Sequence, residues 1–187
     1  SRGWDKEINR LYQRGGVILG IGSSFALLGK TFTTPMSNAH IKGLGFFNAH
    51  IKLLQQEPER VRGEVASVLP KFTNIFDKAE VEGYRICSGE IIRDDKVAKE
   101  FIKIDSGMSG DFDGLISQTG QVIGTFIHGI FNNDNFSQRF VNYLKSIIFK
   151  ESIIENTYSF DFKKYKETEY DRWADVVRKS LDIDLLY

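Results

Sequence analysis

An apolar run that ends in a glycine and serine turn constrains the fold of this chain more than any other feature. Residues 17–21 read Val-Ile-Leu-Gly-Ile, and a short, continuous, β-branched run is typical of a strand buried on both faces of a sheet. Residues 4–14 carry apolar side chains at helical spacing and end at Gly15-Gly16, which predicts an amphipathic helix before the strand. A helix followed by a buried strand predicts an α/β fold.

The turn after this strand is the first candidate site. Gly22, Ser23 and Ser24 lead directly into an apolar stretch at residues 25–29, which predicts a sharp turn into a short helix. Such a turn lifts its apex residue above the sheet and directs helix N–H groups to one place, so nucleophile elbows and phosphate loops both use it. A turn that merely caps a helix would have the same sequence.

The middle of the chain favours consecutive strands over further α/β units. Strand-like segments are predicted at residues 43–54, 60–68, 80–92 and 97–105. Two further runs, at residues 115–117 and 122–127, flank Gln118-Thr119-Gly120 and predict a hairpin. One flank of the sheet should therefore be built from strands that follow one another.

The C-terminal part predicts two helices and a connection. Asp134 or Asn135 can cap a helix that extends to about residue 149, with its apolar side chains on one face. Residues 151–169 have no clear period and are expected to form an exposed connection. From residue 170 the spacing of apolar residues is again that of an amphipathic helix.

Composition excludes several function classes. The 187 residues include 25 Lys and Arg against 25 Asp and Glu, so no net positive field favours nucleic acid or an anionic membrane surface. No apolar run approaches the ~18–20 residues of a membrane span. The length predicts one domain over residues 1–187, and a single cysteine fits a reducing, cytoplasmic setting.

The sequence has no pattern for a metal or a phosphate. The three histidines, His40, His50 and His128, are far apart in the sequence, and no cysteine accompanies them at ligand spacing. The turn at Gly22 also lacks the Gly-Lys-Ser/Thr sequence that completes a phosphate loop. We therefore expect no metal and no cofactor in this chain.

Five stretches along nearly the whole chain match one family in the same order. They are residues 20–29 (Gly-Ile-Gly-Ser-Ser-Phe-Ala-Leu-Leu-Gly), 43–47 (Gly-Leu-Gly-Phe-Phe), 82–89 (Glu-Gly-Tyr-Arg-Ile-Cys-Ser-Gly), 124–133 (Gly-Thr-Phe-Ile-His-Gly-Ile-Phe-Asn-Asn) and 170–175 (Tyr-Asp-Arg-Trp-Ala-Asp). The sequence therefore resembles the C-terminal, class I glutamine amidotransferase domain of the cobyric acid synthase family, whose elbow reads Gly-Ile-Cys-Gly-Gly-Tyr-Gln-Met-Leu-Gly.

The resemblance implies a fold class: α/β, a three-layer doubly wound (flavodoxin-like) sheet. It also implies that one or more N-terminal strands of the family sheet are absent, because residues 4–14 match the helix before the elbow strand. The edge beside residues 17–21 would then be unpaired, which favours a homo-oligomer that covers it. The chain is expected to be part of a larger synthetase.

The resemblance also implies a reaction. In the family, a cysteine takes the side-chain acyl group of glutamine, a histidine acts as the base, and the released ammonia reaches an ATP-dependent synthetase domain or subunit. That partner amidates corrin carboxylates in cobalamin biosynthesis, and ATP and Mg²⁺ are expected there.

Carried over residue by residue, the base position falls on His128 and the nucleophile position on Gly22. Glycine has no side chain, so thiolate chemistry is lost at this elbow. Ser23 and Ser24 take the two elbow positions after the nucleophile position. The resemblance implies that the Ser23 N–H is the first oxyanion donor, whereas the family's other donor lies on a glycine-containing loop after an earlier strand. If the resemblance holds, the His128 ring should lie within roughly 5–8 Å of the Gly22 Cα, whereas a structural histidine would lie elsewhere.

Three alternatives stay open at this point. Ser24 could be a hydrolase nucleophile with His128 as its base, because residues 22–26 fit Gly-x-Ser-x-Ala. Cys87 could be a relocated nucleophile, although a lone cysteine on a strand is more typical of a core. Finally, the chain could be a non-catalytic relative that binds glutamine, another small molecule or a synthetase partner near His128.

Overall fold

The computed structural model describes residues 3–66, 75, 78–106, 110–149 and 161–181. They fall into two compact units, Ser1–Glu155 and Asn156–Tyr187, and each is described by itself. The expectation of a single domain over residues 1–187 stays a prediction.

The first unit is built on one nine-stranded mixed sheet. Its strands are β1 (Ile18–Ile21), β2 (Gly29–Thr34), β3 (Ser37–Lys42), β4 (Phe47–Val65), β5 (Glu80–Arg93), β6 (Lys99–Ile104), β7 (Phe112–Ile116), β8 (Val122–Thr125) and β9 (Ile127–His128). Its helices are α1 (Trp4–Gln13), α2 (Ser23–Ala26), the 3-10 turn η1 (Ile130–Asn132) and α4 (Asp134–Ile148).

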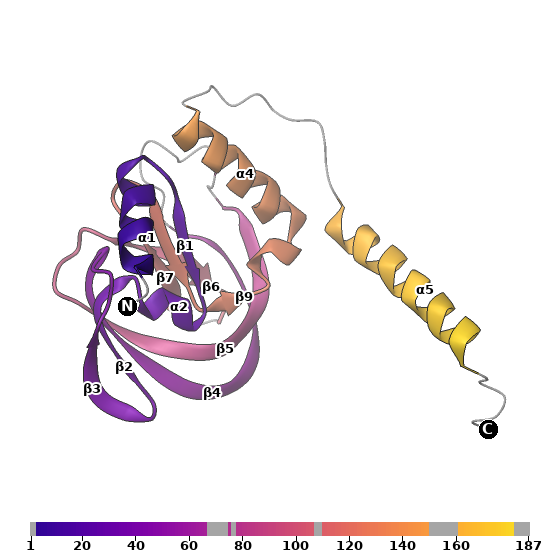
Figure 1. The fold of residues 1–187 in the computed structure, drawn as a ribbon, viewed down its shortest axis with the longest axis horizontal. Helices are drawn as coiled ribbons and strands as arrows, with labels where there is room; N and C mark the ends of the chain where they lie inside the picture. The colour runs from indigo at the N-terminus through magenta and orange to yellow at the C-terminus, as the bar shows by residue number, and fades with distance from the viewer. Residues whose placement is uncertain (1–2, 67–74, 76–77, 107–109, 150–160, 182–187) are drawn as a thin grey trace. The chain divides into compact units, whose positions relative to one another are not determined.

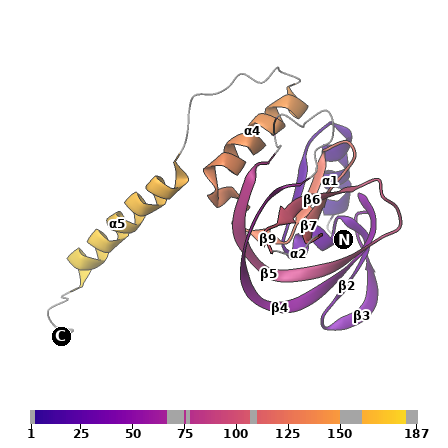
Figure 2. The ribbon, with the colours of Figure 1, turned by 180° about the vertical axis from the view of Figure 1, so that it is seen from behind.

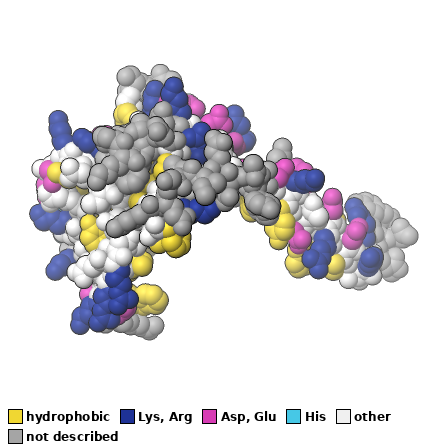
Figure 3. Space-filling view, turned by 90° about the horizontal axis from the view of Figure 1, so that it is seen from above, with side chains coloured by type: hydrophobic (Ala, Val, Ile, Leu, Met, Phe, Trp, Pro, Cys, Tyr) yellow, Lys and Arg dark blue, Asp and Glu magenta, His cyan; other side chains and the backbone are white. Residues whose placement is uncertain are grey.

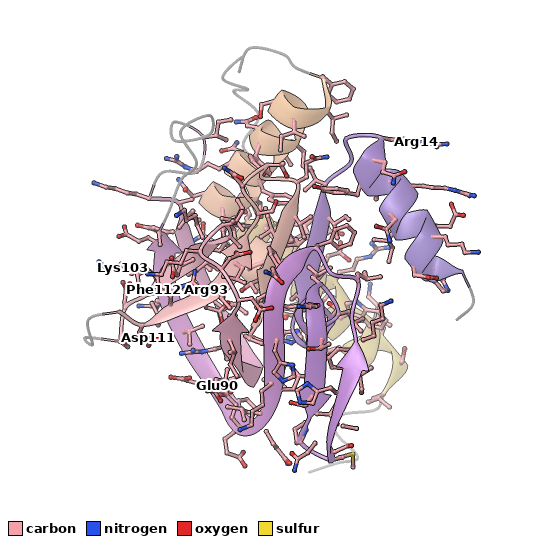
Figure 4. All side chains as sticks on the ribbon, turned by 90° about the vertical axis from the view of Figure 1, so that its left-hand side faces the viewer. Arg14, Glu90, Arg93, Lys103, Asp111 and Phe112 are labelled. Atoms are coloured by element: carbon pink, nitrogen blue, oxygen red, sulfur yellow. The ribbon has the colours of Figure 1, made fainter. Side chains whose placement is uncertain are left out.

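The strand order is β1-β8-β7-β6-β4-β2-β3, and β5 pairs with both β4 and β9. The pairs β1–β8 and β2–β4 are parallel, and the remaining pairs are antiparallel. The long strands β4 and β5 of this sheet pair with each other and are both strongly curved (Figures 1 and 2). On β6 and β7, Lys103 lies directly opposite Phe112 (Figure 4). The predicted open α/β sheet with a flank of consecutive strands is confirmed.

Side chains of β1 alternate between two cores. Leu19 packs against a cluster that contains Phe136 and Tyr143 of α4, whereas Ile18 packs against a cluster that contains Phe25 of α2. Successive side chains of a strand point to opposite faces of its sheet, so helices cover both faces here. This arrangement gives the three expected layers.

β1 lies at one end of the strand order. Within the described residues its one strand partner is β8, in register from Ile18 opposite Val122 to Ile21 opposite Thr125. The open edge predicted beside residues 17–21 is therefore present in the described part of the chain.

Several predicted elements have different bounds. Two strands, β2 and β3, were not predicted, and β4 is one continuous strand through Pro58, although separate strands were predicted at residues 43–54 and 60–68. The β4–β5 register shifts between Gln55 and Glu59, and such an irregularity accommodates a proline that cannot donate to the ladder.

The helix caps also differ. Asn133, rather than Asp134 or Asn135, caps α4, because its side chain accepts a hydrogen bond from the Phe136 N–H at 3.2 Å. Residues 162–169 were expected in a connection but belong to a helix, and residues 151–160 lie outside the described residues.

The described part of the second unit is one helix, α5 (Phe162–Ser180). Asp161 caps it and accepts a hydrogen bond from the Lys164 N–H at 2.8 Å. Hydrophobic side chains gather on one side of α5 (Figure 3), and the apolar residues Trp173 and Val176 of this helix are exposed. None of the described helices has the length and apolar character needed to cross a membrane.

Candidate functional site

Gly22 forms the elbow between β1 and α2. Its backbone angles are φ +63° and ψ −136°, a positive-φ conformation that side chains rarely adopt. Its N–H donates to the Thr125 carbonyl at 2.8 Å, and its carbonyl accepts from the Phe25 N–H at 3.0 Å. The elbow is thus fixed both to β8 and to the start of α2.

His128 also lies at this elbow, although it is far from Gly22 in the sequence. It lies on β9, which pairs with β5 so that His128 is directly opposite Tyr84. A Cβ added to Gly83 would lie 2.2 Å from the His128 carbonyl oxygen, so glycine at position 83 permits the close approach of the two strands. The matched Glu-Gly-Tyr stretch therefore has a packing role beside the histidine.

The His128 ring occupies the space that a side chain at position 22 would need. A Cβ placed on Gly22 would lie 2.3 Å from Nε2 and 2.6 Å from Cε1 of His128. Because one bond of about 1.5 Å joins Cα and Cβ, the ring is nearer than the expected 5–8 Å. The ring can lie this close because glycine leaves that space empty.

Ser23 and Ser24 begin α2, and both are exposed. The Ser24 hydroxyl donates to the Ile21 carbonyl at 2.6 Å and accepts from the Ile21 N–H at 3.0 Å. Its proton is therefore directed at the backbone rather than at His128. A serine nucleophile needs a hydroxyl that donates to its base, so this geometry gives the Ser24 alternative no support.

Cys87 lies on β5 and packs against the core cluster that contains Phe25 and Phe126. Burial, together with the nearby Asp113 carboxylate, raises the pKa of the Cys87 thiol. A raised pKa disfavours the thiolate, which is the nucleophilic form. Cys87 is thus a half-buried residue packed against the core.

The other two histidines form a separate pair. The rings of His40 on β3 and His50 on β4 lie 4.5 Å apart, and His50 Nδ1 is 2.8 Å from the Thr31 hydroxyl. Burial, and then the charge of His40, lower the pKa of His50. Within the described residues, no three His, Cys, Asp or Glu side chains converge as metal ligands do.

Asp113 near the elbow was not singled out as a site residue. This residue of β7 is 2% exposed, and its carboxylate accepts hydrogen bonds from the Thr125 hydroxyl and the Phe126 N–H. The sequence feature that could have identified Asp113 is its position as the lone charged residue in the otherwise apolar strand Phe-Asp-Gly-Leu-Ile. A buried charge of this kind requires partners, which the sequence pattern does not identify.

Comparison with known proteins identifies the family to which this chain is similar. The model of the CobB/CobQ-like glutamine amidotransferase domain matches residues 1–136. A cobyric acid synthase of Thermoanaerobacter sp. is 32% identical over 98% of this chain and 37% of its own length. A second one, from Clostridium acetobutylicum, is 30% identical over 100% of this chain and 36% of its own length. The chain thus spans little more than a third of these relatives.

Among solved structures, PurLQS from Thermotoga maritima is similar at a TM-score of 0.48 and 20% identity, over 75% of this chain and 68% of that one. The domain model matches most of the sequence, including the elbow at Gly22, the Tyr84 strand and His128. The chain belongs to the family of CobB/CobQ-like glutamine amidotransferase domains.

Proposed function

We propose that this chain is the amidotransferase-like part of a cobyric acid synthase and that its glutaminase site is degenerate. The carrying observation is that the His128 ring lies where a nucleophile side chain at Gly22 would begin. Glycine offers no atom that could attack the carboxamide carbon of glutamine, so no acyl-enzyme can form at this elbow. A histidine at the base position alone does not replace that step.

The partner in this proposal is an ATP-dependent synthetase domain or subunit that amidates corrin carboxylates in cobalamin biosynthesis. Support comes from relatives named cobyric acid synthase, of which this chain spans 36–37%. ATP and Mg²⁺ would be bound by that partner, in the cytoplasm. With the glutaminase step lost, free ammonia is the nitrogen source that the synthetase reaction would use.

A glutaminase assay tests the degenerate site. The unmodified chain should release ammonia from glutamine at the background rate, because losing a covalent nucleophile typically costs several powers of ten in rate. Turnover near ~1 s⁻¹, within the usual range for enzymes, would contradict the proposal. In that event Cys87→Ser and Ser24→Ala would show which side chain has become the nucleophile.

The synthetase role is tested separately on the complete protein that contains this chain. Corrin amidation with ATP should proceed with ammonium and fail with glutamine. Amidation that proceeds equally well with glutamine would contradict the degenerate site. Absence of amidation with either nitrogen source would contradict the synthetase assignment itself.

The alternative of a ligand-binding relative makes a different prediction for the same site. Glutamine would then bind without hydrolysis and shift the NMR resonances of the His128 ring. The other two histidines, His40 and His50, serve as internal references because they pair with each other.

A further inference from the structure

The backbone turns sharply just before His128. The chain leaves β8, which pairs with β1 and β7, at Thr125, and it enters β9, which pairs with β5, at Ile127. At such a corner the backbone N–H groups lose the ladder partners of a regular strand, and a buried N–H without a partner is costly. Phe126 and Ile127 are both buried here.

Two side chains supply the missing acceptors. Asp113 Oδ1 accepts from the Phe126 N–H at 3.0 Å and from the Thr125 hydroxyl at 2.5 Å. The Thr125 hydroxyl oxygen in turn accepts from the Ile127 N–H at 3.1 Å. The aspartate and the threonine thus hold both N–H groups of the corner through side-chain bonds.

The same corner is fastened to the elbow. The Thr125 carbonyl accepts the Gly22 N–H at 2.8 Å, while the Thr125 side chain bonds to Asp113. Three residues after Thr125, the His128 ring reaches the space beside Gly22. The place of the ring relative to the elbow therefore depends on the backbone course that Asp113 and Thr125 fix.

The strand that pairs with β9 carries a positive charge that acts on Asp113. Arg85 of β5 lies directly opposite Ile127 of β9. Its positive charge acts to lower the pKa of Asp113, although burial raises that pKa overall. Arg85 also approaches the Glu59 carboxylate at 3.4 Å. The buried carboxyl group thus lies in the field of a cation on the strand that pairs with β9.

We propose that Asp113, acting through Thr125, is the positioning residue that sets the His128 ring against the elbow at Gly22. Its chemical meaning rests on the proposed function, since His128 takes the base position of the family. The claim that Asp113 sets the position of the His128 ring does not rest on the proposed function, and it is tested without any activity assay.

The test is an NMR measurement on the whole chain. A cross-relaxation signal between the Gly22 Hα and the His128 Hε1 reports directly that the ring lies over the elbow. Asp113→Ala should abolish this signal and shift the His128 ring resonances. Asp113→Asn should retain both, because the amide oxygen still accepts at the corner.

A second variant keeps the test decisive if Asp113→Ala does not fold. Thr125→Val preserves the shape of the side chain but can neither donate to Asp113 nor accept from Ile127, so it should also abolish the signal. Thr125→Ser keeps the hydroxyl and should restore it. If Thr125→Val, or a folded Asp113→Ala, keeps the Gly22–His128 signal, the proposal is overturned.

Tyr143→Phe is the matched control for a general loss of stability. The Tyr143 hydroxyl donates to the Gly120 carbonyl, which precedes the start of β8, whereas Thr125 ends that strand. This variant removes a buried hydrogen bond without touching the corner, and it should retain the Gly22–His128 signal. Loss of the signal in this control would show that any destabilisation moves the ring and would also overturn the proposal. The glutaminase assay fails or succeeds independently of these results.

Discussion

The Nε2 atom of His128 lies 2.3 Å from the position that a Cβ of Gly22 would occupy. The two residues are far apart in the sequence, and the ring of one fills the side-chain space of the other. A methyl group at position 22 would therefore meet both a ring and an unfavourable backbone conformation.

Gly22→Ala should lower the free energy of unfolding by about 1–3 kcal/mol, since it places a side chain at φ +63°. Denaturant unfolding measures the loss. Gly45→Ala is the control, because Gly45 has φ +73° but no atom within 4 Å of its added Cβ. Gly22→Ala should cost more than this control, and adding His128→Ala should recover the excess. Equal losses in the two alanine variants would show that the ring does not block the elbow.

The stability of the chain should depend on the protonation of Asp113. Burial raises the pKa of this carboxyl above its ordinary value of 3.8, so the folded chain holds the proton at pH values where the unfolded chain has released it. Stability then falls as pH rises from the ordinary pKa through the raised one.

Asp113→Asn removes that titration. In unfolding curves measured across this range, the wild type should lose stability relative to Asp113→Asn as pH rises. A stability difference that does not change with pH would show that the carboxyl has the same pKa in the folded and unfolded chains.

His50 should make the chain less stable in mild acid. Burial and the neighbouring His40 lower its pKa below 6.5, so the unfolded chain binds the proton more readily than the folded chain. The free energy of unfolding should therefore fall as pH drops from about 7 to about 5. His50→Gln should reduce this fall more than His40→Gln, because burial is the larger cause of the lowered pKa. An unchanged pH dependence in His50→Gln would exclude His50 as the source.

The edge of β1 that has no strand partner among the described residues should promote self-association of this chain. An unpaired apolar edge strand can template pairing with another chain. Sedimentation velocity should show association that increases with protein concentration, and the amides of Ile18–Ile21 should then exchange hydrogen more slowly. Amide exchange in β1 that is the same at low and high concentration would show that the edge does not mediate association.

Local patterns were sufficient for the elements whose cause is local. The apolar spacing before Gly15-Gly16 predicted α1, and the run at residues 17–21 predicted β1. Both predictions were possible because the spacing of apolar residues along the sequence shows which faces of an element are buried. The hairpin of β7 and β8 was likewise predicted from its glycine turn. The family motifs identified Gly22 and His128 as the two positions to compare.

Pairing between strands decided what these patterns missed. β2 was not predicted, and it is held between β3 and β4 by pairing with both. Pro58 does not end β4, since β5 continues to pair on both sides of the irregularity. Pairing with a partner strand overrides local preference in such cases.

By itself, the sequence determined the α/β alternation, the elbow and the absence of a side chain at position 22, because a glycine needs no structure to be recognised. Only the tertiary structure decided that the His128 ring enters the space left at Gly22 and that Asp113 and Thr125 hold the corner before it. The physical reason is that these contacts join strands that are distant or indirectly connected in the chain. Their geometry exists only once the sheet has brought the strands together.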